Sequence, residues 1–327
     1  LFMEILNYYI DYIKKNLAEI DLNKEPQTLY EPIRYGIECG GKRFRPALIL
    51  FLCDLYGGNI DDAVPPALGI ELFHNFTLFH DDIMDKAQMR RGRETVVAKY
   101  GLNKALLAGD TLFAIAYSMV NKTKEKYLVR ILDEFTSTAT KVCEGQQLDM
   151  DFENEIDVSI SDYEKMIYLK TAVLIASSMK IGALLGNCPT ADEMTIYDLG
   201  IHLGLAFQLQ DDYFDCFADE NIFGKKIGGD ILDAKKTFLY ITAYQSIEDE
   251  KDKQDFYNLY NDKNINNDDK INKVIDIYKK LNIDKKTEEQ IDYHIMKTQN
   301  NIDLLSLDKE KKSLLKNVID VIANRSK

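Results

Sequence analysis

Long segments in which apolar residues recur at helical spacing most strongly constrain the fold of this chain. In residues 67–79 the apolar positions 68, 72, 73, 76 and 79 follow the pattern of one helix face. Residues 104–120, 163–185 and 196–217 repeat this pattern. No segment alternates convincingly between apolar and polar residues, and no Asn-Gly pair marks a hairpin. We therefore predict an all-α protein.

The chain is predicted to form one domain, residues 1–327, because no linker divides it. Of its 327 residues, 46% are hydrophobic, which is enough for a sizeable core. Residues 249–273 are rich in Asp, Asn and Lys, and we expect the string NDKNINNDDK, residues 261–270, to be an exposed loop. Helical periodicity resumes at Ile271, so this loop would join two helices of a single-domain bundle.

Charge and cysteine usage exclude several classes of protein. The net charge is −13, and no basic stripe is present to neutralise phosphates, so we expect no nucleic-acid partner. The odd number of cysteines and the absence of CxxC spacing argue against a disulfide framework or a zinc site. Reduced thiols in a cytoplasmic protein are the expected state. The cysteines stand at positions 39, 53, 143, 188 and 216.

No apolar run reaches the ~18 residues that a membrane-spanning helix needs. The longest candidate, AVLIASSM from Ala172, is followed by Lys180. The first seventeen residues mix apolar and charged side chains at helical spacing, unlike a signal peptide. We therefore expect no stable membrane insertion.

The same aspartate pattern ends two of the apolar segments. FTLFHDDIMD and FQLQDDYFD share the DDxxD spacing, 130 residues apart. On a helix, residues i and i+4 share a face, so the outer carboxylates of each set repel unless a cation binds them. Mg²⁺ binds through one or two carboxylates plus substrate phosphates, so two such helices facing each other would hold Mg²⁺ ions around a diphosphate. The two sets are Asp81, Asp82 and Asp85, and Asp211, Asp212 and Asp215.

A solvated acidic patch is the alternative explanation for a single DDxxD motif. Two copies, each at the end of an otherwise apolar helix, favour a functional role. Because apolar residues continue both helices, we expect both aspartate sets at the rim of an interior cavity.

Basic residues cluster near these motifs although the protein is acidic. Each cation alone could be an ordinary surface residue, but together they indicate an anionic ligand held through metal and guanidinium contacts. The clusters are GGKRFRP (residues 40–46, with Lys42, Arg43 and Arg45), Arg90–Arg91, Lys170–Thr171 and GKKIGGDILDAKKT (residues 224–237).

Together these motifs resemble the trans-isoprenyl diphosphate synthases, the polyprenyl synthetase family, over residues 35–238. The resemblance is carried by GGKRFRP, HNFTLFHDDIMD with RRG, Gly109–Asp110, GQQLD, Lys170–Thr171, FQLQDDYFD and GKKIGGDILDAKKT. It implies one helical domain with a central cavity, usually a homodimer. It also implies an enzyme that joins an allylic diphosphate to isopentenyl diphosphate head to tail, with three Mg²⁺ ions per active site.

The resemblance assigns roles to residues at matching positions. It implies Mg²⁺ ligands at Asp81, Asp85, Asp211, Asp212 and Asp215, with Asp82 in support. Asp149 is similar to a family residue near the metal and substrate. The residues implied around the allylic diphosphate are Arg90, Lys170, Thr171, Gln208, Lys226 and Lys235. Of these, Lys170, Thr171 and Gln208 would also stabilise the developing cation.

The resemblance further implies a metal-free isopentenyl diphosphate site at Lys42, Arg45, His74 and Arg91. A lone histidine is more often a core residue, but His74 lies seven residues before Asp81 and therefore on the same helix face. The chain departs slightly from the family pattern, because Lys225 and Lys236 stand beside Lys226 and Lys235 and could share their roles.

Residues before the first aspartate set are predicted to stop the growing prenyl tail. Phe73 and Phe76 share a helix face, and Thr77 stands four residues before Asp81. In the family, an aromatic residue at the fifth position alone accompanies C20 products, whereas aromatics at both the fourth and fifth accompany C15. The pattern here favours geranylgeranyl diphosphate, with farnesyl diphosphate as the alternative; ordinary core packing would also explain both phenylalanines.

Three other functions remain open on the sequence. A terpene cyclase also ionises prenyl diphosphates, but it usually has a different second motif and lacks the GGKRFRP cations. A head-to-head synthase lacks this motif pattern. A non-catalytic subunit of a heteromeric synthase typically loses aspartates, whereas all six are present here.

Overall fold

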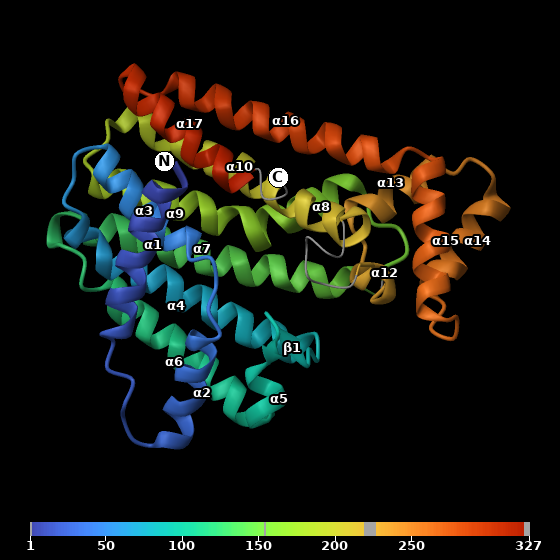
Figure 1. Ribbon diagram of the computed structural model, residues 1–327, viewed down its shortest axis with the longest axis horizontal. Coiled ribbons are helices and arrows are strands. Elements are labelled where there is room, and N and C mark those ends of the chain that lie inside the picture. The colour runs from blue at the N-terminus through green and yellow to red at the C-terminus, as the bar shows by residue number, and fades with distance from the viewer. Residues whose placement is uncertain (1, 154, 219–226, 324–327) are drawn as a thin grey trace. The chain divides into compact units, whose positions relative to one another are not determined.

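Helices joined by short loops make up a computed structural model that describes residues 2–153, 155–218 and 227–323 (Figure 1). The prediction of an all-α protein is confirmed. The helices are α1 (Phe2–Ala18), α2 (Gln27–Glu38), α3 (Phe44–Leu55), α4 (Ile60–Met84), α5 (Val96–Tyr100), α6 (Leu102–Val120), α7 (Glu125–Phe152), α8 (Ile160–Ile167), the π-helix η1 (Tyr168–Ala172), α9 (Val173–Leu185), α10 (Thr190–Phe217), α12 (Gly229–Leu232), α13 (Phe238–Ser246), α14 (Glu250–Asn261), α15 (Asn267–Lys280), α16 (Ile283–Leu304) and α17 (Lys309–Ala323).

The described residues form two compact units. Unit 1 comprises Leu1–Ala139, Ser177–Tyr197 and Leu305–Ile322, and unit 2 comprises Thr140–Ala176, Asp198–Leu304 and Ala323–Lys327. Neither unit is one continuous stretch of sequence. The assignment of residues 1–327 to one domain stays a prediction.

Helix α4 is the central helix of unit 1. It packs against α3 and α6, and Figure 1 shows α4 and α6 side by side. The Asn59 side chain accepts a hydrogen bond from the Asp61 amide and caps the helix. The helix therefore begins seven residues before the periodic segment at 67–79, and Pro65 and Pro66 lie within its second turn rather than before its start.

A small hairpin follows α4, although the sequence gives no strand pattern there. Strand β1 (Met89–Arg90) pairs antiparallel with β2 (Arg93–Glu94). The two turn residues, Arg91 and Gly92, have φ of 53° and 74°. Two left-handed residues match the right-handed twist of a hairpin, so Arg91-Gly92 does what Asn-Gly does more commonly. The sequence pattern did not predict this hairpin, but with two residues in each strand it leaves the protein all-α.

The predicted helix over residues 163–185 has an interruption in its hydrogen-bonding pattern. Helix α8 passes through η1 into α9, so one π-helical segment lies within an otherwise α-helical run. Such segments occur often at functional sites. Together, Ile160–Leu185 is long and apolar enough to span a membrane, but 83% of its most apolar window is buried in the protein, as in the core helix of a globular protein.

The expected loop at residues 261–270 is shorter than predicted. Helix α14 ends at Asn261 and α15 begins at Asn267, so only residues 262–266 connect them. Asn266 accepts hydrogen bonds from the amides of Asp268 and Asp269, and these acidic residues stabilise a helix N-terminus. The polar string therefore contains a helix start. All five cysteines lie among the described residues, and none forms a disulfide there.

Candidate active site

The first aspartate set lies at the end of α4 in unit 1. Asp81 and Asp82 are in its last turn, and Asp85 is the exposed C-cap. Arg90, on β1, donates from Nε to Asp82 Oδ1 at 2.8 Å and from Nη2 to Asp81 Oδ2 at 3.4 Å. Burial raises the pKa of Asp82, and Arg90 opposes that rise. The hairpin thus brings Arg90 onto the aspartates, as its place in the motif suggested.

Three of the residues predicted to bind isopentenyl diphosphate gather in unit 1. Arg45 Nη1 lies 3.3 Å from His74 Nε2, and Arg91 donates from Nη1 to the Gly40 carbonyl. Gly41 has a φ of 151°, a backbone conformation that favours glycine, and a Cβ there would lie 2.6 Å from Arg91 Nη1. Burial and the nearby arginines hold the pKa of His74 well below its usual range, so His74 is neutral.

Lys42, the fourth predicted residue of this group, is exposed in the same loop. Its ammonium lies 5.8 Å from the centre of the Phe44 ring.

Burial and the positive charges of Arg43 and Arg90 lower the pKa of Arg91. Cations held this close to one another are the arrangement expected for a diphosphate-binding surface.

Arg43 differs from its neighbours because it is buried. It pairs with the buried Glu71 and donates from Nη2 to the Ile37 carbonyl at 2.7 Å. Asn75 donates to the same Glu71 carboxylate at 2.9 Å. Arg43 therefore anchors the GGKRFRP loop to α4, and Lys42 and Arg45 are the cations of this loop that are predicted to bind a ligand.

The predicted chain-length residues belong to a cluster of aromatic rings in unit 1. Phe73 and Phe76 are buried, with ring centres 5.5 Å apart. Phe76 stacks on Phe113 of α6 at 4.9 Å and an interplanar angle of 10°. Phe73 also contacts Phe113 and Phe135, each at 5.5 Å. Thr77 donates from Oγ1 to the His74 carbonyl at 2.8 Å.

In unit 2, the π-helix carries Lys170 and Thr171. Lys170 Nζ donates to Asp149 Oδ2 at 2.5 Å, and Thr171 Oγ1 donates to Gln208 Oε1 at 2.9 Å. A Cβ on Gly145 would lie 2.2 Å from the Lys170 amide nitrogen. Glycine in GQQLD is therefore what lets α7 approach the π-helix closely enough for this ion pair.

The second aspartate set lies in the last turns of α10. Asp212 accepts from the Tyr163 hydroxyl at 2.6 Å and from Gln208 Nε2 at 2.9 Å. Burial and repulsion from Asp230 raise the pKa of Asp212, while the two hydrogen bonds oppose the rise. Asp215 accepts the Asp230 amide at 2.9 Å, so it orients the GGDILD turn.

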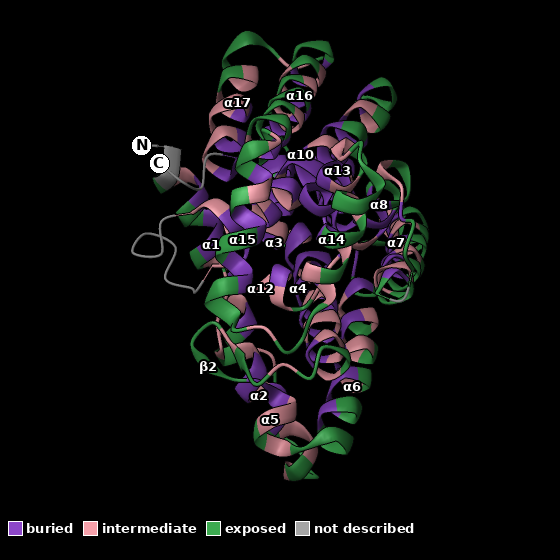
Figure 2. Cartoon of the chain, turned by 90° about the vertical axis from the view of Figure 1, so that its right-hand side faces the viewer, coloured by how far each residue is buried: buried purple, intermediate pink, exposed green. Residues whose placement is uncertain are grey.

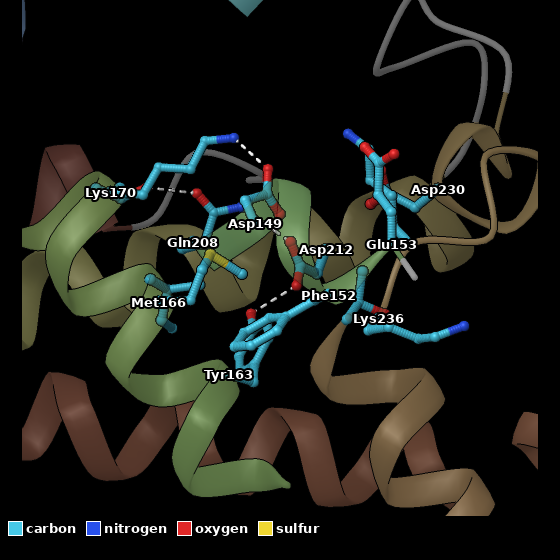
Figure 3. A pocket seen from close by; sticks show the side chains of 14 residues that line it. Asp149, Phe152, Glu153, Tyr163, Met166, Lys170, Gln208, Asp212, Asp230 and Lys236 are labelled. Carbon is cyan, nitrogen blue, oxygen red and sulfur yellow. Dashed lines mark hydrogen bonds and ion pairs between the residues drawn. The ribbon is translucent and has the colours of Figure 1, made fainter. Parts of the chain in front are cut away.

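Most of the unit 2 residues described above line a single pocket. Figure 3 shows the Lys170 and Asp149 side chains meeting on one side and Tyr163 reaching Asp212 on another. Asp211 and Asp215 are not among its lining residues, and Lys226 lies outside the described residues. The pocket is lined by Asp149, Phe152, Glu153, Tyr163, Met166, Ile167, Lys170, Thr171, Gln208, Asp212, Asp230, Lys235, Lys236 and Thr237.

Asp230 and Tyr163 are among the pocket residues that the sequence analysis did not predict. Asp230 lies with Oδ1 3.7 Å from Lys235 Nζ, and burial and the charge of Asp215 raise its pKa. Its place in GKKIGGDILDAKKT was a usable signal, because that motif already stood out for its cations. Tyr163 stands seven residues before Lys170, and on sequence alone it is an ordinary helix residue.

The donor groups of the pocket fit a hard cation. Asp212 and Asp230 are carboxylates whose negative forms are disfavoured by burial and mutual repulsion, which a cation relieves. Within 2–153, 155–218 and 227–323, no three His, Cys, Asp or Glu side chains form a metal site by themselves. Mg²⁺ commonly takes one or two carboxylates plus substrate phosphates, so this donor set suits an ion that binds together with a diphosphate.

Comparison with known proteins shows the family to which the chain belongs. Residues 26–278 match the family described as Polyprenyl synthetase. The chain is 38% identical over 245 residues to a geranylgeranyl diphosphate synthase of Methanosarcina mazei, covering 72% of this chain and 76% of that protein. It is 40% identical over 255 residues to a geranylgeranyl diphosphate synthase of Sulfolobus acidocaldarius, covering 76% of each.

A solved structure agrees with these relatives. The crystal structure of a geranylgeranyl pyrophosphate synthase superposes with a TM-score of 0.91 at 36% identity, covering 100% of this chain and 99% of that one. The chain belongs to the polyprenyl synthetase family.

Proposed function

We propose that this chain is a prenyltransferase that condenses isopentenyl diphosphate head to tail with allylic diphosphates and releases a C20 prenyl diphosphate. The observation that carries the proposal is the unit 2 pocket. There, Lys170 and Lys235 stand beside Asp149, Asp212 and Asp230, and Phe152, Met166 and Ile167 complete an apolar wall. Cations, carboxylates and apolar side chains suit a ligand with a diphosphate head and a hydrocarbon tail.

The aspartates are proposed to bind Mg²⁺ together with the allylic diphosphate. Asp81, Asp85, Asp211, Asp212 and Asp215 would supply ligands and Asp82 would support them, with three ions per active site. When bound, Mg²⁺ neutralises the diphosphate as it departs. Asp82 keeps Arg90 in place, and Asp215 holds the turn that carries Asp230.

The reaction begins as the C1–O bond of the allylic diphosphate breaks and inorganic diphosphate leaves with the electron pair. The double bond of isopentenyl diphosphate then forms the new C–C bond at C1, and a proton lost from its C2 passes to the departing diphosphate. The backbone oxygens of Lys170 and Thr171 and the amide dipole of Gln208 are proposed to stabilise the developing cation. Thr171 and Asp212 hold the Gln208 amide on both sides, so its dipole is fixed. Apolar side chains exclude water, which would otherwise capture the cation.

Isopentenyl diphosphate is proposed to bind without metal at Lys42, Arg45, His74 and Arg91. Since His74 is neutral, its Nε2 accepts a hydrogen bond from Arg45 and orients that guanidinium. Each arginine would then donate two parallel hydrogen bonds to a pair of phosphate oxygens, which a lysine ammonium cannot do. Arg90 and Lys235, with Lys226, are assigned to the allylic diphosphate.

The product length is proposed to be set by the aromatic cluster of unit 1. Phe76 and Phe113 would block further growth of the prenyl tail once it contains about four isoprene units. A block one unit earlier would give farnesyl diphosphate instead. The names of the related synthases support the C20 assignment.

The assembly proposed for the enzyme is a homodimer of single-domain chains in the cytoplasm, neither inserted in a membrane nor bound to nucleic acid. The family match across residues 26–278 includes parts of both units and supports the single domain. Helix α6 exposes Leu102, Leu106 and Leu107, an apolar surface suited to a partner subunit.

An assay with each substrate omitted in turn tests the proposed function. Turnover that requires both isopentenyl diphosphate and an allylic primer is expected. A terpene cyclase would consume the allylic diphosphate alone, and a non-catalytic subunit would be inactive in isolation.

A further inference from the structure

Two adjacent lysines in the turn between α12 and α13 have different surroundings. Both line the pocket, and Lys235 lies with Nζ 3.7 Å from Asp230 Oδ1. Lys236 is buried, and its side chain extends away from Asp212 in Figure 3. The Lys236 ammonium lies 4.6 Å from the ring centre of Tyr240 and 5.8 Å from that of Tyr260. The structure therefore separates the two lysines, which the sequence could not.

Tyr260, in the last turn of α14, contacts the backbone of this turn. Its hydroxyl donates to the Lys235 carbonyl at 2.7 Å and approaches the Asp230 carbonyl at 3.4 Å. Tyr260 is fully buried, and burial raises the pKa of its hydroxyl well above the ordinary value, so it remains a donor. Its ring packs on Tyr240 with centres 4.2 Å apart. Figure 2 shows the surrounding α13 segment buried.

The turn is held from two directions. At its start, Asp215 accepts the Asp230 amide at 2.9 Å, and the Gly228 amide donates to the Asp215 carbonyl at 2.6 Å. Within it, the Lys235 amide donates to the Asp230 carbonyl at 2.9 Å. From outside the turn, Tyr260 reaches the Asp230 carbonyl, which accepts that hydrogen bond, and the carbonyl of Lys235, the residue whose amide donates it. It thereby fixes the backbone from which the Asp230 and Lys235 side chains enter the pocket.

We propose that Tyr260 is a positioning residue for the allylic diphosphate site. Its hydroxyl orders the turn so that the Lys235 ammonium and the Asp230 carboxylate keep their places when the diphosphate head binds. The inference rests on the proposed function, which assigns Lys235 to the allylic diphosphate. It gives the C-terminal helices, which carry no motif, a role in substrate binding.

Tyr260→Phe isolates this role because it removes only the hydroxyl. Both carbonyls keep an amide donor, from Lys235 and from Thr237, so no buried acceptor is stranded. Tyr240→Phe is the matched control. The Tyr240 hydroxyl is equally buried but has no hydrogen-bond partner in the described parts of the chain, and both variants keep the ring stack.

Amide hydrogen exchange of residues 230–237 in the full-length protein reports the contact directly. Exchange should be faster in Tyr260→Phe than in Tyr240→Phe and the unsubstituted chain. In steady-state kinetics, Tyr260→Phe should raise KM for the allylic diphosphate about five- to tenfold while KM for isopentenyl diphosphate stays within about twofold. Tyr240→Phe should leave both within about twofold.

Two results would overturn the inference: exchange in Tyr260→Phe that matches the control, or an equal rise of both KM values. Absence of turnover in the unsubstituted chain would instead refute the proposed function. The exchange rates would then still decide whether Tyr260 orders the turn.

Discussion

The rings of Phe76 and Phe113 lie nearly parallel, 4.9 Å apart, and join α4 to α6 inside unit 1. Phe76 precedes the first aspartate set by five residues on the same helix, and Phe113 comes from a different helix. The barrier proposed to stop the prenyl tail is therefore a pair of rings rather than a single side chain.

Either ring of this pair should limit product length. Phe76→Ala and Phe113→Ala each open space in the aromatic cluster, so products beyond C20 are expected from both variants. Chromatography of products made from labelled isopentenyl diphosphate measures this. Phe76→Ala should also lower the free energy of unfolding by about 3–5 kcal/mol, the usual cost of removing a buried aromatic ring. Phe113→Ala should lower it by less, because Phe113 is only partly buried.

A core substitution outside the cluster separates packing from chain length. Phe51 is buried and contacts Tyr9 rather than the cluster. Phe51→Leu should destabilise the protein and leave the product at C20. Unchanged product length in both Phe76→Ala and Phe113→Ala would assign the pair to core packing alone.

Asp81→Ala should abolish turnover while the fold remains. The substitution removes a proposed Mg²⁺ ligand, but Arg90 keeps its 2.8 Å contact with Asp82. We expect kcat to fall by at least about 10³-fold, with helical content by circular dichroism unchanged. The control is Asp133→Ala, an exposed aspartate of α7 with no proposed role. Retained turnover in Asp81→Ala would remove this residue from the metal site.

Metal removal should stop the reaction without unfolding the protein. Because the proposed ions bind together with a diphosphate, EDTA alone should not change Tm. Mg²⁺ plus inorganic diphosphate should raise Tm, since a ligand that binds only the folded state stabilises it. Thermal unfolding with Mg²⁺, with diphosphate and with both measures this. A large fall of Tm in EDTA would indicate a structural metal instead.

Stability should also fall in mild acid because of a histidine pair in unit 2. His202 Nδ1 lies 2.9 Å from His294 Nδ1, and burial and His202 lower the pKa of His294 to about 4. Burial and Lys297 lower the pKa of His202, and Asp198 opposes this. Both histidines are therefore neutral in the folded protein at pH 7.

The sign follows from proton uptake. An unfolded histidine binds a proton below about pH 6.5, whereas folded His294 does so only near pH 4. At pH 7.5 this histidine is neutral in both states, so its protonation does not affect the free energy of unfolding. As the pH falls to 4.5, the unfolded state takes up the proton and the free energy of unfolding decreases by about 2 kcal/mol. Urea unfolding at both pH values should show that the free energy of unfolding decreases less in His294→Gln than in the unsubstituted chain. Equal decreases in the variant and the unsubstituted chain would contradict the pKa assignment.

Helix positions were predictable because apolar periodicity is a local property. The segment 196–217 and α10 end at the same residue, Phe217. Features that depend on tertiary contacts were not predictable. The π-helix at Lys170 accompanies the close approach of Gly145, and the hairpin turn uses the left-handed backbone of Arg91.

The site could be predicted as far as its motifs extend. Arg45 and His74, which share a predicted role, are in contact. Lys170 pairs with Asp149, a contact that was not predicted. The contributions of Tyr163 and Tyr260 could not be predicted, because a tyrosine that donates to a distant carboxylate or carbonyl looks like any helix residue in the sequence.

Product analysis of the purified chain tests the central claim most directly. The protein would be incubated with Mg²⁺, labelled isopentenyl diphosphate and C5, C10 or C15 allylic primers. The account predicts elongation of all three primers, with products ending at C20. Products of C30 or longer would contradict the chain-length claim, and primer consumption that does not require isopentenyl diphosphate would contradict the proposed reaction itself.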